Sequence, residues 1–268
     1  MTGFAPGAIL RLVWLGAATL VLLPAQLLAI RLDARTAAAV PKLYHRLVCR
    51  ALGVSCTVTG TAPPAGAGGL IVANHVSWLD IAVIGAQRPL CFVAKSEVAD
   101  WPVIGLLSKL QRTVFIDRMR RAATADVAAQ MGARLSAGES VVLFAEGTTG
   151  DGTRILPMRS SLLGAAHAAL GEGNDADITV YPLAISYTGI HGMAGGRSER
   201  SALAWYGDTE LAPHLKAVLA MGAVDVVLAW GEPIVMGAKT SRKEATRLAE
   251  VAIRNARRQA VTGRAASG

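Results

Sequence analysis

No charged side chain occurs between residues 12 and 30 of this 268-residue chain. A helix of about 19 residues rises about 30 Å, which matches the hydrocarbon thickness of a bilayer. Pro24 and Gln26 interrupt the apolar run, and Arg11 and Arg31 flank it. Because positive charge stands on both sides, the positive-inside rule gives no orientation. The segment has to leave water, either in a membrane or in a large core.

A helical hairpin that enters one leaflet and returns would place both basic flanks on the same face of the membrane. Residues 40–52, which are amphipathic and basic, would form its second arm. We therefore expect an anchor, spanning or monotopic. A buried core helix is one alternative. A cleaved signal peptide is another, although the region before the run is weakly basic and no small-residue cleavage site follows.

The overall charge suits anionic partners. Lysine and arginine outnumber aspartate and glutamate by 27 to 19, and 52% of the residues are hydrophobic. Nucleic acid, anionic lipid headgroups and phosphorylated substrates all fit a basic surface. Aromatic residues make up only 5% of the chain, and no nucleic-acid motif is present, so we expect no nucleic-acid partner. The three cysteines match no zinc or redox spacing, and we expect no metal.

After a turn-rich linker at residues 60–69, short apolar runs alternate with helical patterns. Such alternation predicts an α/β fold, with a central, mostly buried sheet flanked by helices. Ser241 and Glu244 form a capping box at the start of the last helix. The expected strands are residues 70–73, 90–94, 113–116, 141–145, 178–185 and 224–230, and the expected helices are residues 78–86, 122–136, 160–170 and 243–259.

The strongest local signal is Asn-His-Val-Ser-Trp-Leu-Asp at residues 74–80. His75 stands where a strand ends and a helix begins, at the sheet edge where α/β sites usually form. Asp80, about one helical turn further on, can accept a hydrogen bond from one ring nitrogen of His75. The other nitrogen is then free to act as a base. This pair predicts removal of a proton from an attacking hydroxyl group.

Two other interpretations use the same residues. Hydrolases pair histidine and aspartate to activate an enzyme serine or cysteine. Ser77 is too close in sequence to be a confident nucleophile, and no G-x-S-x-G elbow is present. In the purely structural interpretation, Ser77 caps the helix and His75 is a satisfied polar residue.

Four blocks in order carry a resemblance to a known family. Residues 74–80 match N-H-x-S-x-x-D, residues 115–118 match F-I-D-R, and residues 144–148 match F-P-E-G-T with alanine for proline. Residues 180–183 match a hydrophobic strand ending on proline. Over roughly residues 40–235 the sequence resembles the glycerophospholipid acyltransferases, whose best-known members are 1-acylglycerol-3-phosphate acyltransferases.

The resemblance implies roles for individual residues. His75 would be the general base and Asp80 would orient it. Arg118 would hold the acceptor's phosphate, for which a guanidinium is well shaped. Glu146 would accept hydrogen bonds from glycerol hydroxyls or from Arg118. The remaining expected substrate-binding residues are Asn74, Ser77, Lys95, Gly147 and Thr148.

One departure from the family pattern concerns the acceptor. The third block usually continues with arginine, whereas this chain has Thr149, and Arg112 could supply the missing charge. The Glu-Gly-Thr-Thr pattern, together with residues 95–97 and 205–208, resembles the lyso-ornithine lipid acyltransferase branch. Those enzymes acylate a hydroxyl on an acyl chain of a lipid that has an amino-acid headgroup and no phosphate. Lysophosphatidic acid and lyso-ornithine lipid both remain open as acceptors.

The resemblance implies an O-acyltransferase at the cytoplasmic face of the inner membrane, with acyl carrier protein or coenzyme A thioesters as donors and no cofactor. Membrane lipids and a lysolipid would be its other partners. A thioesterase or lysolipase, and a non-catalytic lipid-binding protein, are the alternatives. We expect a membrane-associated helical segment at residues 1–58, a catalytic domain at 59–262 and a flexible tail at 263–268.

Overall fold

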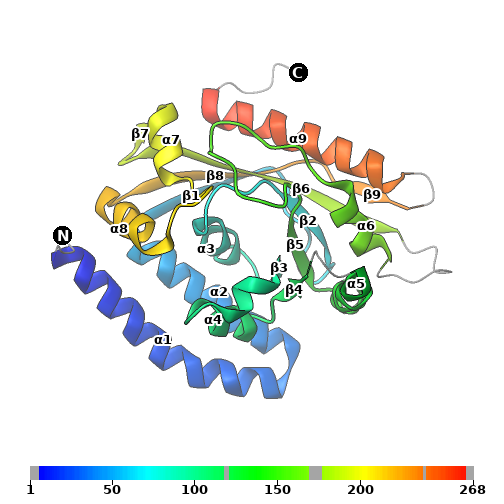
Figure 1. Cartoon of the computed structure of the whole chain (residues 1–268), viewed down its shortest axis with the longest axis horizontal. Helices are drawn as coiled ribbons and strands as arrows, with labels where there is room; N and C mark the ends of the chain where they lie inside the picture. Colours follow the sequence, from blue (N-terminus) through cyan, green and yellow to red (C-terminus); the bar gives the residue numbers. More distant parts are fainter. Residues whose placement is uncertain (1–5, 118–120, 169–176, 238–239, 264–268) are drawn as a thin grey trace.

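The computed structural model describes residues 6–117, 121–168, 177–237 and 240–263 (Figure 1). Within these residues one nine-stranded sheet has the order β1-β8-β6-β2-β5-β3-β4, and β7 and β9 also pair with β6. The strands are β1 (Val54–Thr59), β2 (Gly69–Ala73), β3 (Cys91–Lys95), β4 (Val114–Ile116), β5 (Ser140–Phe144), β6 (Ile178–Ile190), β7 (Met193–Ala194), β8 (Val224–Trp230) and β9 (Ile234–Met236).

The directions of the strands bring several carboxyl ends to one edge of the sheet. β2 runs parallel to β5 and β6, and β3 runs parallel to β4 and β5, so the carboxyl ends of these five strands meet at one edge. β8 pairs with β6 antiparallel, and β1 runs parallel to β8. The residues that follow β2, β3, β4 and β5 are therefore brought to the same edge of the sheet.

Helices cover both faces of the sheet. Because side chains alternate along a strand, Leu70 and Val72 of β2 face one core while Ile71 and Ala73 face the other, and all four are fully buried. The described helical segments are α1 (Pro6–Leu32), α2 (Ala34–Ala51), α3 (Leu79–Gly85), η1 (Ser96–Asp100), α4 (Ile104–Leu110), α5 (Arg121–Ser136), α6 (Ser160–Ala168), α7 (Arg197–Leu203), α8 (Leu211–Met221) and α9 (Arg242–Thr262).

The two hydrophobic cores show which helices cover each face of the sheet. Residues of α2, α3 and α8 pack on one face of the sheet, and residues of α5, α6 and α9 pack on the other. Figure 1 shows α1 and α2 on the opposite side of the molecule from α9. Ser241 Oγ caps α9 by accepting a 3.3 Å hydrogen bond from Glu244 N, as the sequence predicts, although the Glu244 carboxylate contacts Arg247 instead of reaching back.

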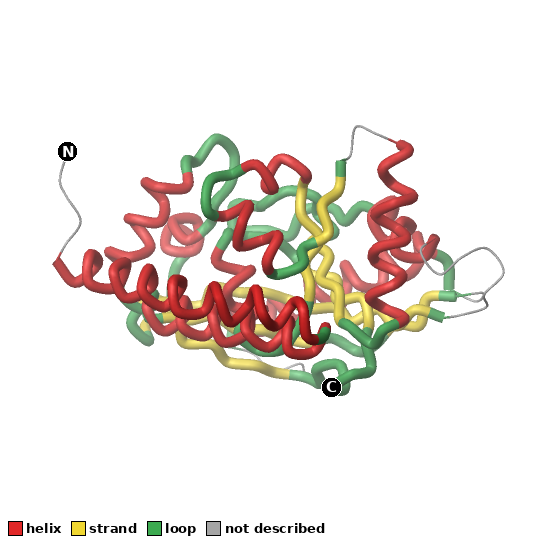
Figure 2. Tube along the Cα trace, turned by 90° about the horizontal axis from the view of Figure 1, so that it is seen from below, coloured by secondary structure: helices red, strands yellow, loops and turns green. Residues whose placement is uncertain are grey.

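The amino-terminal segment is a helical hairpin of α1 and α2, which lie side by side in Figure 2. Within the described residues, α1 is the one helix long and apolar enough to cross a membrane by length and composition. Gln26, in the second half of the apolar run, is buried and donates to Ala37 O (2.9 Å) and to Leu110 O (2.6 Å). Its amide therefore ties α1 to both α2 and α4.

The predicted α/β class, with its flanked central sheet and apolar amino-terminal helix, is confirmed. All six predicted strands are present, as are the four predicted helices as far as the structure describes them. The sequence did not predict β1, β7, β9, η1, α4, α7 or α8. Because β1 begins at Val54 and pairs with β8, the helical segment ends before residue 54 and not at the expected residue 58.

Candidate active site

His75 and Asp80 form the centre of the site. His75 follows β2 by two residues, and Asp80 lies in the first turn of α3. His75 Nδ1 is 2.8 Å from Asp80 Oδ2, which is the contact that the sequence predicts. Because the carboxylate oxygen accepts, Nδ1 carries the proton and Nε2 carries the lone pair. Nε2 has no hydrogen-bond partner among the described residues, and the His75 side chain is 18% exposed.

Asp80 is fully buried, and both of its carboxylate oxygens accept hydrogen bonds. Oδ2 also accepts from Val76 N (2.7 Å) and Ser77 N (3.0 Å), so the carboxylate closes the turn between β2 and α3. Oδ1 accepts a 2.6 Å hydrogen bond from the hydroxyl of Tyr187 in β6. Burial, and then the Asp80 charge, raise the pKa of Tyr187 well above its usual value, which keeps the hydroxyl a donor. The sequence analysis missed Tyr187, and no local motif signals it.

An aromatic stack fixes the plane of the imidazole. The His75 and Phe144 rings lie 3.9 Å apart with an interplanar angle of 15°, and Phe144 stacks in turn near Phe92. Phe144 ends β5 beside β2, so the sheet register itself places the ring under the histidine. The stack and the Asp80 contact together leave the ring little rotational freedom.

Glu146 supports His75 from the neighbouring strand. Its Oε2 accepts from His75 N and its Oε1 accepts from Leu156 N, both at 2.6 Å. Burial raises the pKa of Glu146 to about 7, against the lowering effect of these two donors. The carboxylate is 3% exposed and occupied on both oxygens. Both carboxylate oxygens are thus bonded inside the fold, and the contact with the acceptor or with Arg118 that the sequence predicts stays a prediction.

Asn74 and Ser77 are also internal to the fold. Asn74 Nδ2 donates to Ile185 O (3.0 Å) and Asn74 Oδ1 accepts from Ile185 N (2.8 Å), which ties β2 to β6. Ser77 is fully buried, and its hydroxyl has no partner among the described residues. The hydroxyl does not cap α3, whose first turn has no side-chain cap, and Asp80 N donates to the backbone oxygen of Ser77 instead. Both side chains are buried beside His75, and the substrate contacts that the sequence predicts for them stay predictions.

The Gly147–Thr148 turn lies where the third block predicts it. Gly147 has a φ of +74°, a conformation that glycine adopts without strain, and Thr148 is exposed beside it. The chain then returns to the histidine, because Gly150 N donates a 2.8 Å hydrogen bond to His75 O. An exposed threonine on a turn that touches His75 can contact a ligand.

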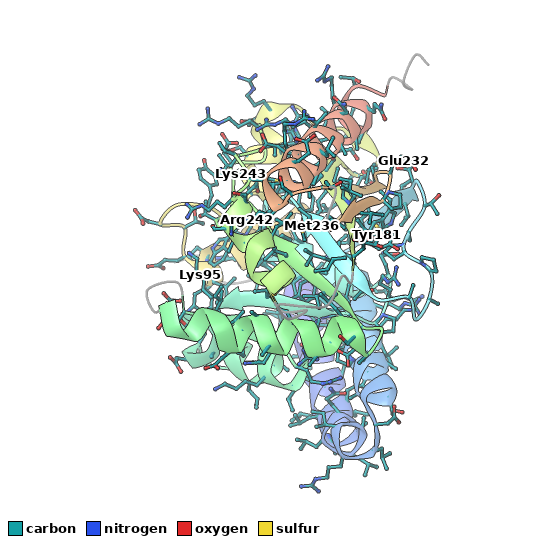
Figure 3. All side chains as sticks on the ribbon, turned by 90° about the vertical axis from the view of Figure 1, so that its right-hand side faces the viewer. Lys95, Tyr181, Glu232, Met236, Arg242 and Lys243 are labelled. Atoms are coloured by element: carbon teal, nitrogen blue, oxygen red, sulfur yellow. The ribbon has the colours of Figure 1, made fainter. Side chains whose placement is uncertain are left out.

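The expected cationic residues are placed unevenly. Lys95 ends β3 at the carboxyl edge, on the left of Figure 3, and its ammonium group has no hydrogen-bond or ion-pair partner among the described residues. Arg118 lies outside the described residues. Arg112 precedes β4, at the opposite edge of the sheet, and pairs with Glu139 at 3.1 Å. Arg112 therefore does not replace the arginine that is missing after Thr148.

A tryptophan from the carboxyl-terminal half contacts the turn that carries His75. Trp205 N donates a 2.9 Å hydrogen bond to Val76 O, and the Trp205 ring packs edge-to-face on Trp101, with centroids 5.9 Å apart. Trp101 is 37% exposed and immediately follows η1. The sequence marks Trp205 as part of a family-like segment, but its contact with the catalytic turn follows from the fold alone.

Comparisons with known proteins agree with this site. The acyltransferase family model matches residues 55–186. The lyso-ornithine lipid O-acyltransferase of Brucella abortus is 45% identical over 92% of each chain, and that of Rhizobium meliloti is 43% identical over 93% of this chain and 85% of its own. The crystal structure of the 1-acyl-sn-glycerophosphate acyltransferase of Thermotoga maritima covers 97% of each chain with a TM-score of 0.63 and 19% identity, a likeness of fold.

The matched region runs from β1 to β6 and contains the His75–Asp80 turn, Glu146 and the Gly147–Thr148 turn. The alignments to the Brucella and Rhizobium proteins extend the similarity over nearly the whole chain. These findings confirm the family resemblance that the four sequence blocks indicate, and this chain is an enzyme that belongs to the acyltransferase family.

Proposed function

We propose that this enzyme is a lysolipid O-acyltransferase, that its acceptor is lyso-ornithine lipid, and that His75 is its general base. The His75–Asp80 pair carries the assignment. Asp80 holds Nδ1 at 2.8 Å, so the unpartnered Nε2 presents its lone pair at the partly exposed end of the ring. An alcohol has a pKa far above 7, and a base positioned in this way typically gives about 10²–10⁴-fold acceleration.

The reaction would proceed by direct attack. His75 Nε2 takes the proton of the acceptor hydroxyl as its oxygen bonds to the thioester carbonyl carbon. The tetrahedral intermediate then expels the thiolate, which receives the proton back from His75, and the acyl ester and the free thiol leave. Asp80 stabilises the imidazolium between the two steps. An acyl carrier protein or coenzyme A thioester would be the donor.

Two observations favour lyso-ornithine lipid over lysophosphatidic acid as the acceptor. The relatives in Brucella and Rhizobium that match nearly the whole chain are named for lyso-ornithine lipid. Thr149 stands where phosphate-binding members of the family carry an arginine, and Arg112 is held at the other edge of the sheet. A site built for a phosphate would be expected to keep that cation.

The exposed apolar residues support a membrane location. Leu10, Val13, Leu20 and Val21 of α1 are each more than 60% exposed. Such side chains in a row favour burial in lipid. Since the Gln26 amide ties α1 to α2 and α4, we propose a monotopic hairpin that keeps this attachment, in place of an independent spanning helix. The cytoplasmic face, where acyl thioesters are made, is the side that suits the donor.

The apolar surface continues toward the site along η1 and α4. One end of α4 accepts the Gln26 hydrogen bond at Leu110 O, and the exposed residues Val103 (67%) and Leu106 (54%) lie nearer the other end. Trp101 then contacts Trp205, which binds the catalytic turn. We propose that η1 and α4 rest on the bilayer, so that lipid chains reach His75 without crossing water.

The deciding experiment uses membranes that contain the enzyme, labelled acyl carrier protein and coenzyme A thioesters, and lyso-ornithine lipid or 1-acylglycerol-3-phosphate as the acceptor. We expect labelled ornithine lipid from the wild type and at least 100-fold less from His75→Ala. His191→Asn, at an exposed histidine next to β6, is the matched control and should keep full activity.

Labelled phosphatidic acid in place of ornithine lipid would reassign the acceptor and keep the chemistry. Labelled free fatty acid as the sole product would move the enzyme to the thioesterase or lysolipase class, because water would then be the nucleophile. Product formation that survives in His75→Ala would refute the general-base role.

A further inference from the structure

Two arginines outside the four family blocks converge on the loop that follows Glu146. Arg257, in α9, donates from Nη2 to Gly152 O at 2.6 Å. The backbone of Arg200, in α7, lies beside the same residue, because a Cβ added to Gly152 would lie 2.9 Å from the backbone oxygen of Arg200. In Figure 1, α7 and the carboxyl-terminal end of α9 lie on the same side of the molecule. We call Arg200 and Arg257 the arginine pair.

The arginine pair has no counter-ion among the described residues. No carboxylate oxygen lies within 4.0 Å of either guanidinium there, and Asp151 turns both oxygens to Thr153. Arg200 donates from Nη1 to Gly195 O, while its Nε is buried with no partner. Burial, and then the Arg200 charge, lower the pKa of Arg257, against the raising effect of the Asp151 and Glu146 charges. Two half-buried like charges with unused donors are unfavourable unless an anion binds them.

The loop links the arginine pair to the catalytic turn. Gly150 N donates to His75 O at 2.8 Å. The Cβ position of Gly152 is 3.3 Å from a methyl carbon of Val76, the residue next to His75. One loop of three residues thus separates the Arg257 guanidinium from the backbone of the turn that carries His75. The pair also flanks the chain just after Thr149, where the family pattern would place a cation.

We propose that the arginine pair binds the carboxylate of the acceptor's amino-acid headgroup, a proposal that rests on the proposed function. A guanidinium binds a planar carboxylate through two parallel N–H donors. In a lyso-ornithine lipid about five bonds, or about 6 Å, separate the carboxylate from the carbon that bears the reactive hydroxyl. An acceptor held by its carboxylate beside Gly152 can therefore turn that hydroxyl toward His75 Nε2.

The test compares two acceptors in three forms of the enzyme. Lyso-ornithine lipid and its carboxamide, which lacks the negative charge, are compared in wild type, Arg200→Gln and Arg257→Gln. We expect the wild type to prefer the carboxylate by about 10- to 100-fold in kcat/KM. Each variant should lose most of that preference through a higher KM for the carboxylate acceptor, with the KM for the thioester donor and the rate with the carboxamide unchanged.

Arg258→Gln is the matched control, because Arg258 is the next residue of α9 and is exposed, with its guanidinium on Asn255. This variant should keep the wild-type preference. Arg257→Lys retains the charge but not the two parallel N–H donors of the guanidinium. Its preference for the carboxylate acceptor should lie between those of wild type and Arg257→Gln. Melting temperatures are measured alongside, and the wild-type comparison of the two acceptors stands even if a variant fails to fold.

Equal use of both acceptors by the wild type would overturn the proposal, as would a variant that slows both acceptors alike. A rise in the KM for the thioester would also overturn it, since the anion would then be a phosphate of the donor. Failure of the proposed function is a different result, with no transfer to lyso-ornithine lipid at all. In that case the affinities of N-acylornithine without the hydroxyl and of its carboxamide are compared, and tighter binding of the carboxylate form would support the arginine pair without any catalysis.

Discussion

The hydroxyl of Tyr187 donates a 2.6 Å hydrogen bond to the one Asp80 oxygen that His75 does not contact. Tyr187 comes from β6, which pairs with β2, the strand that leads into His75. Asp80 is thus held between the histidine that it orients and a side chain fixed by the sheet. This contact makes Tyr187 a positioning residue for the His75–Asp80 pair.

Tyr187→Phe removes that donor and leaves a buried carboxylate oxygen unsatisfied. Since hydrogen bonds to charged groups contribute about 1.5–3 kcal/mol, we expect a loss of about 2 kcal/mol in the free energy of unfolding. We also expect a fall of about tenfold in kcat with both KM values unchanged. Tyr181→Phe, on the same face of β6, is the control and should leave kcat unaffected. Unchanged kcat in Tyr187→Phe would show that Asp80 is positioned without it.

Asn74→Asp replaces an amide donor with a carboxylate oxygen that faces Ile185 O. Asn74 is 1% exposed, so the repulsion cannot be relieved by water, and we expect a loss of about 3 kcal/mol in the free energy of unfolding. Chemical denaturation in detergent measures this loss. The exposed Asn255→Asp serves as control. A raised KM for the acceptor at unchanged stability would instead indicate that Asn74 contacts substrate, as the family pattern implies.

Stability should depend on pH through Glu146. Burial raises its pKa from 4.5 to about 7, so between these values the folded chain binds a proton more readily than the unfolded chain. The contribution is full below about pH 4.5 and is lost as pH rises to about 7, by at most about 3 kcal/mol. The difference in unfolding free energy between wild type and Glu146→Gln should therefore shrink from pH 5 to pH 8. A constant difference would contradict this sign.

Leu106→Ser tests the proposed membrane contact of α4. Burying a leucine side chain contributes about 1.5–3 kcal/mol, so partitioning onto lipid vesicles should weaken about tenfold while α1 keeps the protein attached. Val251→Ser, at an exposed valine of α9, should partition like wild type. Sedimentation with vesicles of anionic and zwitterionic lipid measures both variants. Equal partitioning of the two would place α4 away from the bilayer.

Local pattern was enough to predict much of the fold. The central strands appear as apolar runs because both faces of the sheet are covered, so every side chain in β2 after Gly69 and in β5 is buried. β1 was missed because it lies at the sheet edge with mostly exposed side chains and shows no such run. The short α4 and α7 were missed because each has just seven residues and no recognisable cap.

The contact between His75 and Asp80 could be predicted because the two residues share one turn. Tyr187 could not, since its contact with Asp80 spans 107 residues and depends on the β2–β6 register. Glu146 shows a second limit. Its position after β5 was clear from the sequence, but the two backbone N–H groups that occupy it come from segments folded around it.

The contacts of β6 with the motif at residues 74–80 limit how the length of this motif can vary. β6 forms hydrogen bonds with both ends of the motif. Asn74 bonds to the backbone of Ile185, and Asp80 bonds to the hydroxyl of Tyr187, two residues further along the strand. Ile185 and Tyr187 are one pleat repeat apart along β6, which is about 6–7 Å. These two contacts therefore do not depend on the side chains of residues 76–79, whereas a one-residue insertion or deletion between Asn74 and Asp80 would break one of them. Natural variants of the motif should differ by replacement and not by length.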